Sequence, residues 1–267
     1  WRMLQITADA RFADVMEREI YNGVISGVSL DGRNYFYTNP LEHDGGKDLA
    51  GGFRGSMRRT SMHWDGCACC PPNMARTLAS LPAYFHGVSK DAIYIHHYAA
   101  GAAKFGVGGA TIEITQKTDF PWDGKVSLTV NCAAPAAAKL MLRIPSWCEK
   151  ASVKVNGTDL SSAAKAGSYL EINRTWNSGD RIEADFPMSI RRIAPNPNVK
   201  DDAGKVAIAR GPVVYCIESV DFKGKDLFKV ALPDSADLKY SFEKDLLNGV
   251  GVIESTAKYG ADKCDFK

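Results

Sequence analysis

The stretch KVSLTV, residues 125–130, decides the fold class, because polar and apolar side chains alternate strictly along it. Alternation with a period of two places all the apolar side chains on one face of a β-strand. Seven further short apolar or alternating segments are also strand candidates, and turns rich in Gly, Pro and Asn separate them. The eight strand candidates are residues 92–96, 111–115, 125–130, 139–144, 153–157, 169–172, 181–186 and 206–209. Short strands between such turns predict an antiparallel β-sandwich.

Before residue 91 the apolar pattern is helical. A stripe with a spacing of four predicts an amphipathic helix from about residue 9 to residue 24. The stripe consists of Phe12, Met16, Ile20 and Val24. A second helix is predicted directly after Pro71 and Pro72, since proline is favoured in a first helical turn, and Pro82 then kinks or shortens it. Helices therefore come first and strands second.

The pattern predicts three parts of the chain. Residues 1–90 contain the two predicted helices, residues 91–220 form the sandwich, and residues 221–267 are a C-terminal β extension or part of a second β domain. In the last part the pattern is weaker, with two strand candidates at 227–232 and 250–255.

Composition excludes several classes of partner. Of the 267 residues, 33 are Lys or Arg and 31 are Asp or Glu, which gives a net charge of +2. Such a balance offers no electrostatic basis for binding nucleic acid or an anionic membrane. The apolar runs are also shorter than the ~18–20 residues of a membrane helix. We therefore expect neither partner. The chain starts at Trp1 and not at Met, so we expect sequence upstream and predict no localisation.

The stretch CACCPPN, residues 67–73, carries the clearest chemistry. Three of the seven cysteines, Cys67, Cys69 and Cys70, lie here, just before the second predicted helix. Thiolates bind zinc well, but a structural zinc site takes four ligands, so further ligands must come from another segment. A helix N-terminus also stabilises a thiolate, which is the form that a nucleophile needs.

Other interpretations of these cysteines stay open. They can be packed side chains below a helix start, or ligands of a purely structural zinc ion. Redox chemistry would require a thioredoxin-like βαβ pattern, which the surrounding sequence does not show. An odd number of cysteines in a chain of this size does not indicate a small disulfide scaffold.

Several motifs resemble the β-L-arabinofuranosidase family of glycoside hydrolases. The N-terminal motifs are RMLQITADAR at 2–11, DVMER at 14–18, YNG at 21–23, GVSLDG at 27–32, FYTNP at 36–40 and CCPPN at 69–73. The downstream motifs are IPSWC at 144–148, VNG at 155–157, WNSGD at 176–180, PM at 187–188 and ARGPVVY at 209–215. The resemblance covers at least residues 1–220, and its most specific motif is the cysteine pair followed by two prolines.

The resemblance implies that residues 1–90 are the C-terminal helices of an (α/α)6 barrel, followed by an antiparallel, jelly-roll-like β-sandwich. It implies a retaining hydrolase of arabinofuranosides with a zinc ion held by a glutamate, a nearby cysteine and the pair Cys69 and Cys70. Cys69 is then the nucleophile, and a separate glutamate is the general acid and base. Glu17 and Tyr37 are implied to contact the sugar of an arabinose-containing glycan or glycoside.

Local patterns alone would assign Glu17 and Tyr37 differently. Glu17 lies four residues after Ala13 and three before Ile20, on the flank of the apolar stripe. Without the family it is interpreted as a solvated helix glutamate. Tyr37 alternates with Tyr35, which favours packing.

The resemblance places the remaining zinc ligands and the general acid upstream of Trp1. We therefore expect this chain alone to be inactive, and to self-associate or bind an upstream barrel fragment through exposed apolar helix faces. The alternative is a non-catalytic sandwich module that supports a barrel or binds sugar, with Cys69 and Cys70 holding a structural metal. The sequence does not define which glycan or linkage is cut, or the oligomeric state.

Two histidines and three tryptophans are interpreted as structural. His96 and His97 end a strand candidate, so we expect them to face opposite sides, one in the core and one exposed. The tryptophans adjoin turns, which favours packing over sugar stacking. They are Trp122, Trp147 and Trp176.

Overall fold

The computed structural model describes residues 1–35, 42, 60–61, 69–222, 226–260 and 262–266. The chain has few helices and several sheets that are almost entirely antiparallel, so the predicted mixture of α and β structure is confirmed. It divides into two compact units. Unit 1 comprises Trp1–Ile25 and His63–Met188, and unit 2 comprises Ser26–Met62 and Ser189–Lys267.

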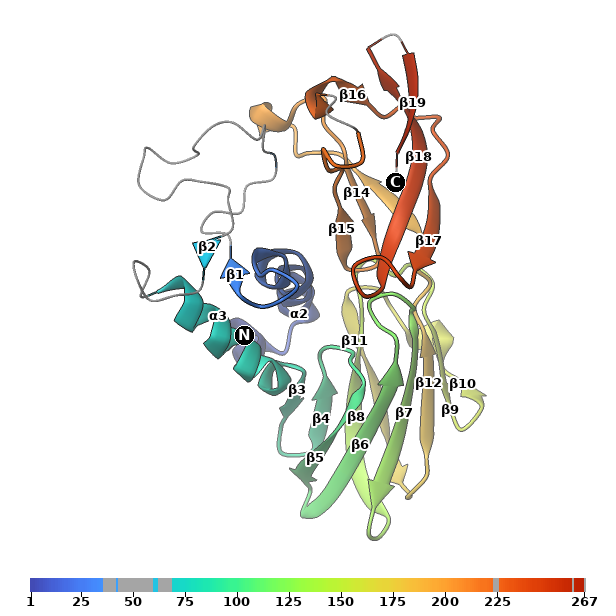
Figure 1. The fold of residues 1–267 in the computed structure, drawn as a ribbon. Helices are drawn as coiled ribbons and strands as arrows, with labels where there is room; N and C mark the ends of the chain where they lie inside the picture. The colour runs from blue at the N-terminus through green and yellow to red at the C-terminus, as the bar shows by residue number, and fades with distance from the viewer. Residues whose placement is uncertain (36–41, 43–59, 62–68, 223–225, 261, 267) are drawn as a thin grey trace. The chain divides into compact units, whose positions relative to one another are not determined.

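Unit 1 contains the three α-helices (Figure 1). They are α1 (Arg2–Thr7), α2 (Ala10–Glu19) and α3 (Cys70–Ser80). Asp9 begins α2, because its carboxylate accepts a hydrogen bond from the Arg11 N–H at 3.0 Å and so caps the helix. The helix predicted over residues 9–24 is α-helical to Glu19 and continues as a π-helical turn at Ile20–Val24. None of the described helices is long and apolar enough to cross a membrane.

Two sheets follow α3 in unit 1. The six-stranded sheet has the order β10-β9-β12-β7-β6-β5, and the four-stranded sheet has the order β11-β8-β4-β3. Their strands are β3 (His86–Val88), β4 (Ala92–Ile95), β5 (Gly101–Val107), β6 (Ala110–Thr118), β7 (Lys125–Cys132), β8 (Ala136–Ile144), β9 (Ser152–Val155), β10 (Thr158–Asp159), β11 (Ser168–Trp176) and β12 (Arg181–Asp185). All neighbours are antiparallel except β4 and β8, which run parallel.

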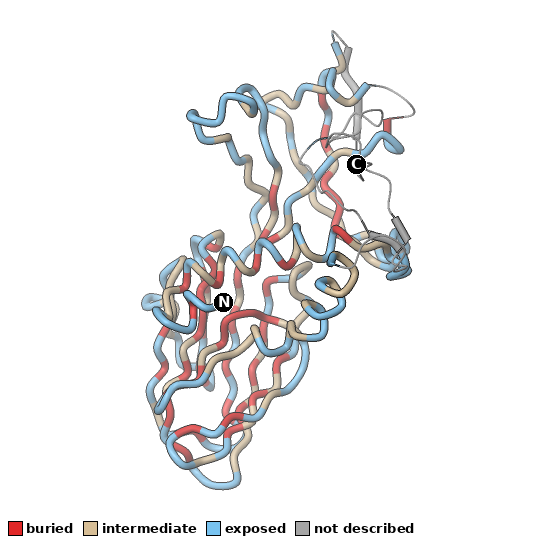
Figure 2. The backbone as a smooth tube through the Cα atoms, turned by 90° about the vertical axis from the view of Figure 1, so that its left-hand side faces the viewer, coloured by how far each residue is buried: buried red, intermediate tan, exposed pale blue. Residues whose placement is uncertain are grey.

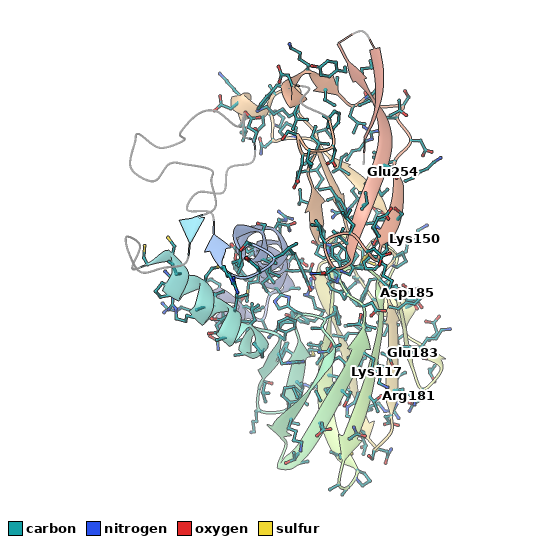
Figure 3. All side chains as sticks on the ribbon, in the orientation of Figure 1. Lys117, Lys150, Arg181, Glu183, Asp185 and Glu254 are labelled. Atoms are coloured by element: carbon teal, nitrogen blue, oxygen red, sulfur yellow. The ribbon has the colours of Figure 1, made fainter. Side chains whose placement is uncertain are left out.

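One hydrophobic core joins the two sheets of unit 1, as the buried segments along the strands in Figure 2 show. Both sheets contribute fully buried side chains to it, including Ile112, Ile114, Leu128, Leu140, Leu142 and Trp176. On β12, Ile182 and Ala184 are buried, whereas Arg181 and Glu183, labelled in Figure 3, are exposed. The predicted alternation is therefore confirmed, and it places the apolar side chains between the sheets.

The expectation for His96 and His97 is wrong, because both are buried, with 4% and 3% of their surface exposed. Strand β4 ends at Ile95, so the alternation of a strand stops before these two residues. Their backbone N–H groups both donate to the carbonyl of Phe85, at 2.9 and 3.2 Å. The Nδ1 atom of His96 lies 2.6 Å from the hydroxyl of Tyr169.

Unit 2 consists of short antiparallel strands. They are β1 (Asn34–Tyr35) paired with β2 (Thr60–Ser61), a sheet of β13 (Ile190–Ile193), β14 (Ala207–Arg210) and β15 (Val213–Tyr215), and a sheet of β16 (Val230–Ala231), β17 (Lys239–Glu243), β18 (Val250–Tyr259) and β19 (Asp262–Phe266). The guanidinium of Arg210 lies 3.5 Å from the ring centre of Tyr240, as a cation–π contact. The candidate at 250–255 is confirmed as part of β18. In the candidate at 227–232 only β16 is a strand, because Leu227–Lys229 form a 3₁₀ turn. The domain boundaries at 90 and 220 stay predictions.

Gly124 lies against the backbone of Phe186. A Cβ atom added at Gly124 would lie 2.0 Å from the Phe186 carbonyl oxygen, and the Phe186 N–H donates to the Gly124 carbonyl at 3.1 Å. We expect Gly124→Ala to lower the free energy of unfolding by about 2 kcal/mol or more. The added Cβ meets backbone atoms of Phe186, so no side-chain rotation can relieve the overlap. Gly106→Ala is the matched control on β5, where a Cβ meets nothing within 4 Å. Equal losses in urea unfolding of the two variants would contradict the prediction.

Burial lowers the pKa of three histidines, His86, His96 and His97, so the free energy of unfolding depends on pH in acid solution. Burial lowers the pKa of His86 from 6.5 to about 4. Burial, then His86 and Arg143, lower the pKa of His96 from 6.5 to about 3. Between these values and 6.5 the unfolded chain binds protons that the folded chain does not. The free energy of unfolding therefore decreases as the pH is lowered below 6.5, by at most about 1.4 kcal/mol per pH unit for each histidine. Above about pH 7.5 these groups add no pH dependence.

Urea unfolding from about pH 7.5 down to about pH 5 checks this dependence. His86→Gln should show a shallower loss of stability with acid than the unchanged protein, because one of the three histidines that take up a proton on unfolding is gone. Identical slopes for the two proteins would show that His86 is not responsible.

Candidate functional site

Two adjacent thiols lie at the N-terminus of α3. Cys69 occupies the N-cap position without a side-chain capping bond, and Cys70 is the first residue of the helix. The prolines that follow favour a helix start. The helix predicted after this pair is confirmed. It ends as an α-helix at Ser80 and continues as a 3₁₀ turn, as Pro82 predicts. The Cys69 side chain is exposed, Cys70 is partly buried, and neither forms a disulfide.

The spacing of the two sulfurs fits binding of one metal ion. The Sγ atoms of Cys69 and Cys70 lie 3.7 Å apart. Tetrahedral zinc with Zn–S bonds of about 2.3 Å places two thiolate sulfurs roughly 3.8 Å apart. Within the described part of the chain, no group of three or more His, Cys, Asp or Glu side chains could hold a metal ion. Tyr37 and Cys67 lie outside the described residues.

Glu17 lies in a buried network with two side chains of the sandwich. Its side chain is 1% exposed, and that of Arg143 on β8 is 0% exposed. The Nη2 atom of Arg143 donates to Oε1 of Glu17, and the indole Nε1 of Trp147 donates to Oε2 at 2.8 Å. Both carboxylate oxygens are therefore held by the sandwich, and the interpretation of Glu17 as a solvated helix residue is wrong.

Arg143 has further partners that fix its position. Its Nη1 donates to Oδ1 of Asp14, one turn before Glu17 on α2, at 2.5 Å, and its Nε donates to the carbonyl of His96 at 2.5 Å. The Ser146 N–H donates to the same Asp14 oxygen at 3.2 Å. Burial alone would lower the pKa of Arg143, but the Glu17 and Asp14 carboxylates outweigh it and raise the pKa. The guanidinium therefore stays charged.

A π-helical turn adjoins this network and carries Tyr21. Burial and then the charge of Glu17 raise the pKa of the Tyr21 phenol, so the hydroxyl stays protonated. The ring of Tyr21 packs near that of Phe120, with centroids 6.1 Å apart. Such turns occur frequently at functional sites.

Sequence reasoning did not single out Arg143 and interpreted Trp147 as packing. One signal was present. Along 139–144, residues 140, 142 and 144 point into the core, so Arg143 projects from the opposite face of the sheet. Alternation alone does not show that α2 covers that face, and so it could not predict a buried ion pair.

Comparison with known protein families identifies the class of the chain. Residues 1–83 match the beta-L-arabinofuranosidase GH127 catalytic domain and residues 92–188 match the GH127 middle domain. Residues 190–254 match the glycoside hydrolase family 127 C-terminal domain. The helices with the thiol pair, and the sheets that follow them, thus match domains of one glycoside hydrolase family. The chain belongs to glycoside hydrolase family 127, the beta-L-arabinofuranosidases.

Individual relatives agree with this assignment. The chain is 38% identical over 271 aligned positions to a non-reducing end beta-L-arabinofuranosidase of Bifidobacterium longum subsp. longum, covering 96% of this chain and 39% of that protein. A crystal structure of a GH127 beta-L-arabinofuranosidase from Geobacillus stearothermophilus T6 matches with a TM-score of 0.89 and 40% identity, covering 99% of this chain and 44% of that one. A further GH127 beta-arabinofuranosidase structure matches with a TM-score of 0.85 and 32% identity, covering 99% of this chain and 43% of that one. The chain thus spans about two fifths of the length of these relatives.

The buried network of Arg143, Asp14 and Glu17 should contribute measurably to the free energy of unfolding. Arg143→Met would leave the Asp14 and Glu17 carboxylates buried without their cation, so we expect the free energy of unfolding to fall by about 3–5 kcal/mol. Arg11→Met is the matched control, because Arg11 pairs with Asp9 where the two side chains are 74% and 39% exposed. The control should change stability by less than about 1 kcal/mol. If urea unfolding gave the same loss for both variants, the network would not be a major source of stability.

Proposed function

We propose that this chain is part of a retaining beta-L-arabinofuranosidase, in which Cys69 is the nucleophile that attacks the sugar. The observation that carries the proposal is the pair of thiols at the N-terminus of α3, with Sγ atoms 3.7 Å apart, in a chain of family GH127. The name of the 38% identical relative, a non-reducing end beta-L-arabinofuranosidase, supports an arabinose-containing glycan or glycoside as substrate.

Cys69 carries the bond-making steps of this proposal. The Sγ atom attacks the anomeric carbon as the glycosidic C–O bond breaks, and the leaving oxygen takes a proton from the general-acid glutamate that the family implies. Water, deprotonated by the same glutamate, then attacks this carbon and releases the thiolate. Two inversions at one carbon retain its configuration.

Cys69 and Cys70 are also the proposed zinc ligands, together with a glutamate and a further cysteine that the family implies. Bound zinc supplies positive charge that keeps the Cys69 thiol deprotonated and oriented. The fit of the 3.7 Å sulfur separation to tetrahedral geometry supports this assignment. Cys70 holds the ion beside the nucleophile, and does not itself attack the substrate.

In this proposal Glu17 and Tyr37 contact the sugar. The helices α1 to α3 are proposed to belong to an (α/α)6 barrel. The family resemblance implies that the general acid and the remaining zinc ligands come from sequence that these 267 residues do not include. The isolated chain is therefore inactive by itself. Exposed apolar side chains on α1 and α2 offer a surface for other barrel helices or for self-association, namely Met3, Ile6 and Val15.

Cys69→Ser tests the nucleophile. In the complete protein it should lower kcat for p-nitrophenyl β-L-arabinofuranoside by at least roughly 10³-fold. The matched control is Cys132→Ser, because Cys132 lies on β7 with its Sγ 3.5 Å from the Trp176 carbonyl, and serine can keep this contact.

Cys70→Ser should reduce zinc content in elemental analysis. Full activity of Cys69→Ser with its metal retained would instead favour a structural metal site, and activity of the isolated chain would contradict its proposed inactivity.

A further inference from the structure

The carboxylate of Glu17 is held entirely by side chains that follow it in the chain by more than a hundred residues. Arg143 lies near the end of β8, and Trp147 lies in the turn after that strand. Both fall within residues 92–188, which match the GH127 middle domain, whereas Glu17 falls within residues 1–83, which match the catalytic domain. The two family domains therefore meet at this carboxylate, as they also do at that of Asp14.

We propose that Arg143 and Trp147 are positioning residues for Glu17, so that the sandwich orients a carboxylate that binds the sugar. The inference rests on the proposed function, in which Glu17 contacts the substrate. It adds that the middle domain takes part in substrate recognition through these two side chains.

The geometry suits positioning because each donor is itself anchored. Besides Glu17, the guanidinium of Arg143 contacts Asp14 and the His96 carbonyl, and the Tyr98 hydroxyl donates to the Arg143 backbone carbonyl. A planar guanidinium with donors in a rigid fork cannot rotate without breaking several of these bonds. The orientation of β8 is thereby transmitted to one oxygen of Glu17.

Trp147 anchors the second oxygen of Glu17. Its indole ring packs near the ring of Phe120, with centroids 6.1 Å apart, and it is packed against the sandwich core. Donors on both oxygens fix the rotation of the carboxylate about its terminal bond. A carboxylate offers about four acceptor sites, so two bonds leave roughly two sites for sugar hydroxyl groups. The arrangement therefore sets the direction of the remaining acceptor sites.

Trp147→Phe is the sharper probe, because it removes a single N–H donor and keeps an aromatic ring. In the complete protein we expect kcat/KM for p-nitrophenyl β-L-arabinofuranoside to fall about tenfold, mainly through a higher KM, as befits one lost bond to a charged group. Trp176→Phe is the matched control. Its indole donates to the Ala138 carbonyl at 3.0 Å in the core, with no exposed surface. The control should lower Tm and leave KM unchanged.

A second comparison separates positioning from a structural role. If Trp147 acts through Glu17, Trp147→Phe should change kcat/KM by less than about twofold in a Glu17→Gln background. An equal effect of Trp147→Phe with and without Glu17→Gln, or a rise in KM for Trp176→Phe as large as that for Trp147→Phe, would overturn the inference alone. An inactive complete protein, or Glu17→Gln with unchanged kcat/KM, would instead overturn the proposed sugar contact and this inference with it.

Discussion

The buried guanidinium of Arg143 is the constraint on which the arrangement of unit 1 depends. A charge without access to water is very unfavourable unless oppositely charged groups surround it. Helix α2 must therefore lie on the four-stranded sheet with Asp14 and Glu17 turned towards β8. The other residues buried on α2 are Ala10 and Ala13, whose small side chains allow the close approach that these ion pairs require. Charge pairing and these small side chains therefore determine how closely this helix approaches the sheet.

The thiol pair and the carboxylate show opposite environments, and each suits its proposed role. The Cys69 side chain is exposed at a helix start, where a substrate can reach it. The Glu17 side chain is 1% exposed and bonded through both oxygens, which gives it one orientation. A fixed direction favours a group that recognises hydroxyls in one geometry. The two environments lie on different helices of the same unit.

The family assignment changes how the sandwich is understood. Residues 92–188 match a middle domain by sequence, yet their Arg143 and Trp147 side chains contact the segment that matches the catalytic domain. The sandwich has its own hydrophobic core, and it also contacts the helices through specific polar side chains. Without α2, Arg143 would lose both of its carboxylate partners, Asp14 and Glu17. Its guanidinium could then stay buried only if another carboxylate took their place.

The sequence by itself determined the elements that depend on neighbouring residues. Strict alternation at 125–130 predicted β7, and two prolines after Cys70 predicted the start of α3, because strand period and helix initiation are local properties. The motif around Cys69 also indicated the family. Only the tertiary structure decided the partner of Glu17, which lies 126 positions away at Arg143. A periodic pattern shows which face of an element a residue occupies, but the element that covers that face is chosen by long-range packing and by the need to pair buried charges.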